Sequence, residues 1–257
     1  MGNFYLLNCL CFGEDMSTSL RKDLKDKRRK QRQKQRQIAA LAIIGGVALL
    51  VGIIVLSGFL RNSTPVGDFT VITPDAHPQV NGTAMGDPNA PVRIDAFEDF
   101  QCPACQYYSE NVEHLVIDNL VTPGTVYYVF HNYPFIDDRA ATKESDQAAN
   151  ASMCAADQGR FWDYHQMLYA NWKGENEGNL SDKRLTAFAD SLGLDMDKFN
   201  TCFKANQFKD QINADLAEGQ KMGVQGTPSV FVNGKLIDPG QVPTYEDIKA
   251  AVDAAQN

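Results

Sequence analysis

Two cysteines separated by two residues carry the clearest chemistry in this sequence. Cys102-Pro103-Ala104-Cys105 directly follows an alternating apolar stretch at 91–97, which predicts a strand. Residues 102–120 repeat apolar side chains at spacings of three and four, so the tetrad is expected to open an amphipathic helix. Pro103 would then occupy the first helical turn, where its missing N–H removes no hydrogen bond.

The start of a helix favours a thiolate. Unpaired N–H groups and the helix dipole attract negative charge there, so the pKa of Cys102 is expected to be lowered. Cys105 lies one turn further on, close enough to form a disulfide with Cys102. The two residues are predicted to be catalytic in thiol–disulfide exchange, with Cys102 as the exposed nucleophile and Cys105 as the more buried resolving thiol. This redox-active disulfide would carry the electrons itself, so no further cofactor is expected.

A structural disulfide and half of a zinc site are the other uses of such a pair. A zinc site needs four ligands, commonly with a second Cys or His pair. Cys154 and Cys202 stand alone, and the four histidines are scattered along the chain: His77, His114, His131 and His165. We therefore expect no metal site. A purely structural bridge rarely spans three residues at a helix start, so the spacing favours redox chemistry.

A long apolar segment lies near the N-terminus. Residues 38–60 carry no charge and are long enough for a helix that crosses the ~30 Å hydrocarbon core. Residues 21–36 before them hold ten Lys and Arg against two Asp, which places this side in the cytoplasm. The sequence predicts a cytoplasmic basic segment at 1–37, poorly structured over residues 1–20, and an uncleaved transmembrane signal-anchor at 38–60. A cleaved signal peptide, the alternative, would usually have a shorter apolar core.

Charge is distributed unevenly along the chain. It carries 24 Lys and Arg against 32 Asp and Glu, a net charge of −8. Because the basic residues concentrate in 21–36, the part after residue 60 is strongly acidic, which argues against nucleic acid as a partner. The basic run alone could bind nucleic acid, but the apolar segment directly after it favours a membrane flank.

The remaining sequence indicates a mixed α/β domain. Residues 61–82 are rich in Pro, Gly and polar residues and predict a linker, with a short edge strand at 69–73. The domain is expected to span 83–257. Strands are predicted at 91–97, 125–131, 229–232 and 235–237. Helices are predicted at 102–120, within an insertion at about 139–222, and at 244–255 after an N-cap at Thr244. Asn233-Gly234 predicts the hairpin turn between the last two strands.

Three stretches carry a family resemblance. Residues 97–105 (FEDFQCPAC) resemble the active-site segment of the DsbA-like family of bacterial thiol–disulfide oxidoreductases. Residues 223–234 (GVQGTPSVFVNG) resemble the family's cis-proline loop, and residues 161–165 (FWDYH) are similar to part of its helical insertion. The likeness covers about residues 83–256. It implies an α/β thioredoxin-like fold with a helical insertion, here preceded by a single transmembrane helix.

The resemblance also implies how substrate is bound. Thr227–Pro228 would be a cis peptide that faces the cysteine pair. An extended substrate segment could then pair with the exposed backbone of this loop as an added strand, largely independent of its side chains. The expected substrate-binding residues are Thr227, Pro228, Pro103 and Ala104.

The residues next to the cysteines do not determine from sequence how oxidising the cysteine pair is. Strong oxidants of the family often carry His where this chain has Ala104, and Ala offers the thiolate neither charge nor hydrogen bond. The resemblance implies that Glu98 or Asp99 is a partly buried acid in proton transfer with Cys105. A solvated acidic loop is the other interpretation of these two residues. Either acid would tend to raise the pKa of a nearby thiol.

Cys154 and Cys202 form a second pair on the inferred oxidising side of the membrane. An even number of cysteines there favours a disulfide, and the resemblance implies a bridge at matching places. We expect a structural disulfide. A shuttle pair that relays oxidation is the alternative, and it would require exposed sulfurs.

The resemblance implies an oxidase that forms disulfides in unfolded or partly folded exported proteins. A quinone-linked membrane protein would reoxidise it, and the catalytic domain would work outside the cytoplasm, held to the cell membrane by one helix. A disulfide reductase or isomerase using the same site is one alternative, because Ala104 leaves the potential open. A non-enzymatic holdase for unfolded exported proteins is the other, and it would need no accessible thiol of low pKa.

Overall fold

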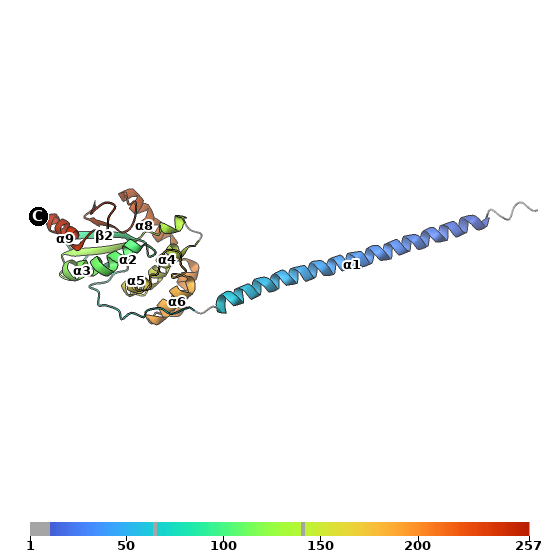
Figure 1. Ribbon diagram of the computed structural model, residues 1–257, viewed down its shortest axis with the longest axis horizontal. Coiled ribbons are helices and arrows are strands. Elements are labelled where there is room, and N and C mark those ends of the chain that lie inside the picture. The colour runs from blue at the N-terminus through green and yellow to red at the C-terminus, as the bar shows by residue number, and fades with distance from the viewer. Residues whose placement is uncertain (1–10, 64–65, 140–141, 257) are drawn as a thin grey trace, which may run out of the picture. The chain divides into compact units, whose positions relative to one another are not determined.

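The computed structural model describes residues 11–63, 66–139 and 142–256, drawn as coloured ribbon in Figure 1. The chain divides after residue 65 into two compact units. The first contains one long helix, and the second contains a sheet with the helices that cover it.

Helix α1 runs from Cys11 to Ser63. Its part from Arg21 to Ser57 is long and apolar enough to cross a membrane, judged by length and composition. The prediction of a poorly structured N-terminus was wrong from Cys11 onward, where the structure is helical. The basic run at 21–36 also extends the helix, because Lys, Arg and Gln are strong helix formers. Residues 1–10 of the predicted cytoplasmic segment lie outside the described residues.

The sheet has five strands in the order β1-β3-β2-β4-β5. The strands are β1 (Ala84–Met85), β2 (Val92–Glu98), β3 (Val126–Asn132), β4 (Ser229–Val232) and β5 (Lys235–Leu236). Central β2 is parallel to β3 and antiparallel to β4. Four strands lie where the sequence predicts them, whereas β1, with only two residues, is too short to show a periodic pattern. Asn233 and Gly234 have φ values of 46° and 78°, the two positive angles that a type I′ hairpin turn requires.

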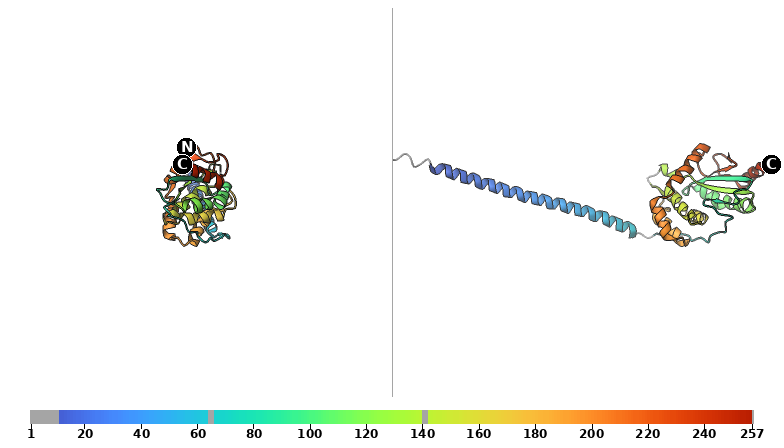
Figure 2. Two further views of the ribbon diagram at one scale, coloured as in Figure 1. Left: turned by 90° about the vertical axis from the view of Figure 1, so that its left-hand side faces the viewer. Right: turned by 180° about the vertical axis from the view of Figure 1, so that it is seen from behind.

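Strand β2 presents a different set of side chains to each face of the sheet. Ile94 and Ala96 belong to the main core together with Cys105, on what we call the cysteine face. Phe97 points to the opposite face, where it packs with Val224 and Phe231 below helix α8 (Lys209–Met222). Figures 1 and 2 show α8 on one side of the sheet and α2 on the other. We call the side of the sheet that α8 covers the α8 face.

The helical segment after the cysteine motif is continuous but irregular. It comprises α2 (Pro103–Tyr108), the π-helical turn η1 (Ser109–Glu113), α3 (His114–Val116) and a second π-helical turn η2 (Ile117–Val121). The predicted apolar stripe is buried, as Tyr108, Val112, Val116 and Leu120 show. The π turns were not predicted, because spacings of three and four do not distinguish them from α-helix.

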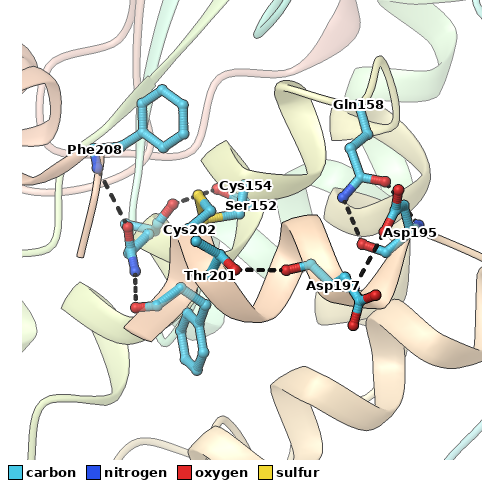
Figure 3. Close-up of a disulfide and its surroundings, with 11 residues drawn as sticks. Ser152, Cys154, Gln158, Asp195, Asp197, Thr201, Cys202 and Phe208 are labelled. Atoms are coloured by element: carbon cyan, nitrogen blue, oxygen red, sulfur yellow. Dashed lines mark hydrogen bonds between the residues drawn. A yellow bond between two sulfur atoms is a disulfide. The ribbon is translucent and has the colours of Figure 1, made fainter. Parts of the chain in front are cut away.

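The insertion is helical, as predicted. It contains η3 (Ile136–Arg139), α4 (Glu144–Ala156), α5 (Phe161–Ala170), α6 (Asp182–Ser191), α7 (Met196–Ala205) and α8. Cys154 on α4 forms a disulfide with Cys202 on α7, with a Cα–Cα distance of 5.9 Å (Figure 3). The bridge therefore connects the first and fourth α-helices of this insertion.

The segment predicted as a linker is docked on the domain from residue 66 onward. The ring of Phe69 packs edge-on against Phe188 of α6, with ring centres 5.1 Å apart. The Asn171 side chain accepts a hydrogen bond from the Thr70 N–H and donates one to the Thr70 carbonyl. The expected edge strand at 69–73 is therefore absent from this described segment, because a side-chain amide takes the place of a strand partner.

Helix α9 (Tyr245–Ala255) closes the domain against β4 and α3. Thr244 caps it, as predicted: its Oγ1 accepts a hydrogen bond from the Asp247 N–H, and the Asp247 carboxylate accepts one from the Thr244 N–H. This reciprocal capping box satisfies two backbone donors and fixes where the helix begins.

Candidate active site

Cys102 and Cys105 lie where strand β2 leads into helix α2. Cys102 is the N-cap residue, with extended backbone angles (φ −72°, ψ 123°), and Pro103 follows in the first turn. Both cysteines are free thiols. Cys102 is only 6% exposed and Cys105 is fully buried. The expectation of an exposed Cys102 was therefore too strong, because the surrounding loops leave only a small part of this residue accessible.

The pKa values of the two thiols are shifted in opposite directions. A hydrogen bond from the Cys105 thiol is the largest cause that lowers the pKa of Cys102 to about 6, and it outweighs the opposing effect of burial. The backbone N–H groups of Ala104 and Cys105 lower this pKa further. Burial raises the pKa of Cys105 well above its usual value. The helix start thus contributes to thiolate stabilisation as expected, but the neighbouring thiol contributes more.

The loop before β4 lies against Cys102. The Thr227–Pro228 peptide is cis, and the Cys102 thiol donates a hydrogen bond to the Thr227 carbonyl oxygen at 3.2 Å. A groove of about 530 Å³, which we call the cis-proline groove, is lined by Ala104, Thr227 and Pro228 together with residues around β5. Pro103 is exposed but does not line this groove. The structure thus brings three of the four expected substrate-binding residues to one surface.

Glu98 ends strand β2 and is 1% exposed, with its side chain on the cysteine face. Burial, and next the nearby Glu113 carboxyl group, raise the pKa of Glu98 well above its usual value. The Tyr169 hydroxyl donates a hydrogen bond to Glu98 Oε2 at 3.0 Å. The charge of Glu98 in turn raises the pKa of Cys105. Glu98 is therefore a buried acid electrostatically coupled to the resolving thiol.

Asp99 is equally buried but fully bonded. Its carboxylate accepts hydrogen bonds from the backbone N–H groups of Gln101 and Ile136 and from the Ser145 hydroxyl. Burial raises its pKa to about 7 despite these bonds. The interpretation of a solvated acidic loop was wrong for both acids, since packing from η3 and α4 covers what the local sequence presents as a polar loop.

Two residues of this region were not identified as functional candidates from the sequence. Glu113 on η1 and His165 on α5 are 3% exposed each, and their side chains lie beside Glu98. One ligand atom from each of the three residues lies within 4.8 Å of the other two, a spacing that could hold a metal ion. For Glu113 the sequence did offer a signal of burial, because this residue directly follows Val112 of the predicted apolar stripe. The absence of a metal site stays a prediction.

The second cysteine pair is inaccessible. Cys154 is 1% exposed and Cys202 is 5% exposed. Because disulfide exchange needs a sulfur that a thiolate can reach, this burial gives no support to a shuttle role.

Comparison with known proteins gives a consistent result. Residues 79–254 match a family model described as "Thioredoxin". The chain is 30% identical over 174 residues to a probable disulfide bond formation protein D of Bacillus anthracis, covering 66% of this chain and 76% of that protein. A thioredoxin-like oxidoreductase from Silicibacter pomeroyi DSS-3 has a similar structure, with a TM-score of 0.56 and 28% identity over 68% of this chain and 92% of that one.

Oxidised BdbD from Bacillus subtilis supports the fold, with a TM-score of 0.60 and 24% identity over the same shares of the two chains, 68% and 92%. The thioredoxin-family match and the relative named as a probable disulfide bond formation protein agree with the geometry around Cys102. The chain therefore belongs to the thioredoxin family, and within it to the DsbA-like protein disulfide oxidoreductases.

Proposed function

We propose that the protein oxidises cysteine pairs of exported proteins through Cys102 and Cys105. A substrate thiolate attacks the Cys102 sulfur of the oxidised pair, the Cys102–Cys105 bond breaks, and Cys105 leaves with the electron pair. A second substrate thiolate then attacks the substrate sulfur of the mixed disulfide and releases Cys102 as a thiolate. The substrate has lost two electrons, and the enzyme pair has gained them.

The acidity of Cys102 is the observation that carries this proposal. A pKa of about 6 means that the reduced enzyme holds Cys102 mainly as thiolate at neutral pH. Stabilising the thiolate stabilises the reduced form, which makes the disulfide form more oxidising. Ala104 contributes nothing to this stabilisation through its side chain, whereas the Cys105 thiol and the first-turn amides do. The disulfide pair needs no separate cofactor for this reaction.

The cis-proline groove is the proposed substrate site. It begins at Ala104 beside the nucleophile and continues along Thr227 and Pro228. An extended segment lying there could use backbone groups of the loop, which suits an enzyme that acts on many unfolded chains. Pro103, exposed next to Cys102 but not part of the groove wall, would contact the same substrate beside the groove.

The two buried acids have different proposed roles. Glu98, which is coupled to Cys105 and has one oxygen without a hydrogen-bond partner among the described residues, would exchange a proton with that thiol. Asp99 would instead hold the loop between β2 and α2 through its three hydrogen bonds, and so position the cysteines. The Cys154–Cys202 bridge would stabilise the insertion.

The proposed location is the outer side of the cell membrane. Residues 38–60 of helix α1 would span the bilayer, with basic residues before them in the cytoplasm. A tether keeps the catalytic domain close to a membrane partner and so raises its effective concentration. That partner would be a quinone-linked protein that takes electrons from the Cys102–Cys105 dithiol.

Trapping of mixed disulfides tests the function. The full-length Cys105→Ser variant should accumulate exported cysteine-containing proteins on Cys102, visible as reducible adducts and identified by mass spectrometry. The matched control, with both Cys102 and Cys105 replaced by Ser, should carry none. Equal adducts on both variants would contradict the proposal.

The reduction potential tests the direction of electron flow. We expect a value well above that of thioredoxin, about −270 mV. Equilibration of the wild-type chain with glutathione buffers gives this value, and a potential near thioredoxin's would favour a reductase using the same site.

A further inference from the structure

The resolving thiol has no direct route to solvent. Cys105 is fully buried, yet its sulfur must accept a proton when it leaves the disulfide and lose that proton when the enzyme is reoxidised. Glu98, the acid coupled to it, is 1% exposed. A proton exchanged between Cys105 and Glu98 therefore has to pass through at least one more group before it reaches water.

Glu98 faces two further groups that could take part. Glu98, Glu113 and His165 bring one ligand atom each within 4.8 Å of the other two. Glu98 Oε1 and His165 Nε2 are buried and have no hydrogen-bond partner among the described residues. His165 Nε2 lies 3.6 Å from Glu113 Oε2. Buried polar atoms normally have partners, so this inner space is the place for an exchangeable proton or a molecule that carries one.

Three hydroxyl groups donate hydrogen bonds to the two carboxyl groups. The Tyr169 hydroxyl donates to Glu98 Oε2 at 3.0 Å, the Tyr128 hydroxyl donates to Glu113 Oε1 at 3.0 Å, and the Ser109 hydroxyl donates to Glu113 Oε2 at 3.1 Å. These bonds fix the orientation of both carboxyl groups. None of these three hydroxyls donates to Glu98 Oε1.

A cavity connects this cluster to the surface. It has a volume of about 280 Å³ and is lined by Glu113, His165 and Tyr169, together with Asp75, His77 and Glu110. Neither Glu98 nor any residue of the cis-proline groove lines it. Glu113 therefore belongs both to the buried cluster and to the cavity wall, and it alone contributes a carboxyl group to both.

We propose that Glu113 relays protons between Glu98 and water in this cavity, so that Cys105 exchanges its proton by a route separate from the substrate groove. This inference rests on the proposed function, because it assigns a path to the proton of that reaction. A substrate bound over Cys102 would then leave the route open.

The proton balance follows the exchange reaction. When Cys105 leaves as a thiolate, it takes a proton from protonated Glu98, Glu98 takes one from protonated Glu113, and Glu113 is reprotonated by water in the cavity. On reoxidation the Cys105 thiol gives its proton to Glu98, and the proton leaves through Glu113. The Cys105 thiolate then attacks Cys102 in the mixed disulfide and displaces the partner's thiolate.

The surrounding titratable groups suit such a relay. Burial raises the pKa of Glu113 to about 7, so it can both hold and release a proton near neutral pH. The pKa of His165 is lowered to about 3 by burial, so the imidazole is neutral and does not hold a cation beside Glu113. The buried hydroxyls of Tyr108, Tyr128 and Tyr169 stay protonated, because burial raises their pKa values.

The test isolates the step that needs the buried proton. A mixed disulfide between glutathione and Cys102 is formed on the full-length chain, and its resolution by Cys105 is followed by stopped-flow across pH 5–9. We expect Glu113→Gln to slow this resolution about 100-fold, a typical contribution of acid–base catalysis, and to remove its pH dependence near 7. The matched control is Glu110→Gln, which makes the same change at an exposed residue of the cavity wall and should resolve at the wild-type rate.

Chemical rescue separates a relay from a structural role. Glu113→Ala opens the cavity toward Glu98, and formate should restore at least a tenth of the wild-type resolution rate in this variant. Alkylation of the Cys102 thiolate by iodoacetamide in the reduced enzyme should stay within about twofold of wild type in both Glu113 variants, because that step transfers no proton to or from Cys105.

Three results would overturn the relay. They are a wild-type resolution rate in Glu113→Gln, a rate in Glu113→Ala that formate does not change, and a wild-type rate that falls after dialysis against EDTA. The last result would mean that a metal ion occupies the cluster. Any of them would leave the proposed function intact if Cys105→Ser still traps exported proteins, whereas loss of trapping would remove the function itself.

Discussion

The two faces of the sheet bury acidic and imidazole groups in opposite ways. On the α8 face, His131 lies between two carboxylates, with Nε2 2.8 Å from Asp95 and Nδ1 3.5 Å from Asp215. Burial opposes the imidazolium, but hydrogen bonds to Asp215 and Asp95 outweigh it and raise the pKa of His131 to about 9. Arg93 adds a further ion pair to Asp95. The charges on this face are matched by opposite charges.

The cysteine face has no cation among the described groups of its acid cluster. Burial raises the pKa of Glu113 to about 7 and lowers that of His165 to about 3, so both groups move toward their neutral forms. The two faces show that burial alone does not determine charge, because neighbouring opposite charges can outweigh its effect. Matched charges hold a structure together, whereas unmatched acids near neutral pH keep protons that can move. The redox pair lies on the unmatched side.

Removing the cation from the matched face should have the largest effect on stability. His131→Leu removes the imidazolium that pairs with both Asp95 and Asp215. We expect the free energy of unfolding near pH 6 to fall by about 3–5 kcal/mol, since breaking a buried ion pair leaves an uncompensated charge. Urea denaturation measures this, and a loss below 1 kcal/mol would mean that the network does not stabilise the fold.

The pH dependence of the unfolding free energy should show whether His131 on the α8 face is charged. The pKa of His131 is raised from 6.5 to about 9 in the folded protein, so its contribution is fully present below pH 6.5 and is lost as pH rises through 9. The linkage amounts to about 3 kcal/mol. The difference in unfolding free energy between wild type and His131→Leu should therefore narrow by about this amount from pH 6 to pH 9.5. A constant difference would show that His131 is not charged in the folded state.

The thiolate of Cys102 is the stabilised anion on the cysteine face, and its acidity depends on Cys105. Cys105→Ala removes the hydrogen bond that most lowers the pKa of Cys102, so we expect this pKa to rise by about one unit or more from about 6, equivalent to at least about 1.4 kcal/mol. Cys105→Ser is the matched control, because a hydroxyl can still donate that bond. Thiolate absorbance at 240 nm against pH reports both values. Equal pKa values in the two variants would assign the acidity to the helix start instead.

Removing the histidine from the unmatched face should have the smallest effect. His165→Leu deletes a buried imidazole whose Nε2 has no hydrogen-bond partner among the described residues, and it keeps a similar volume. We expect a change in unfolding free energy below about 1.5 kcal/mol, since no ion pair is broken. Urea denaturation beside His131→Leu gives the comparison, and similar losses for both variants would refute the distinction between the two faces.

Local sequence patterns predict elements well where the pattern is long enough. The alternation at 91–97 predicts β2, the apolar stripe from Tyr108 to Leu120 predicts the helix after the cysteines, and Thr244 marks the start of α9. The same patterns miss β1, which has two residues, and treat residues 66–82 as a linker. That segment docks through single contacts such as Phe69 on Phe188, which leave no periodic signal in the sequence.

The sequence by itself determined the chemistry: two thiols three residues apart at the start of a helix, with Thr227-Pro228 beyond the insertion. These features are local or are carried by short motifs, so the order of residues is sufficient to show them. Only the tertiary structure decided the acidities. Glu98 and Asp99 are neighbours in the chain, yet Glu98 has an oxygen without a hydrogen-bond partner among the described residues, whereas Asp99 is held by three hydrogen bonds. A pKa depends on the charges and donors that packing brings from distant segments, and no local pattern encodes those neighbours.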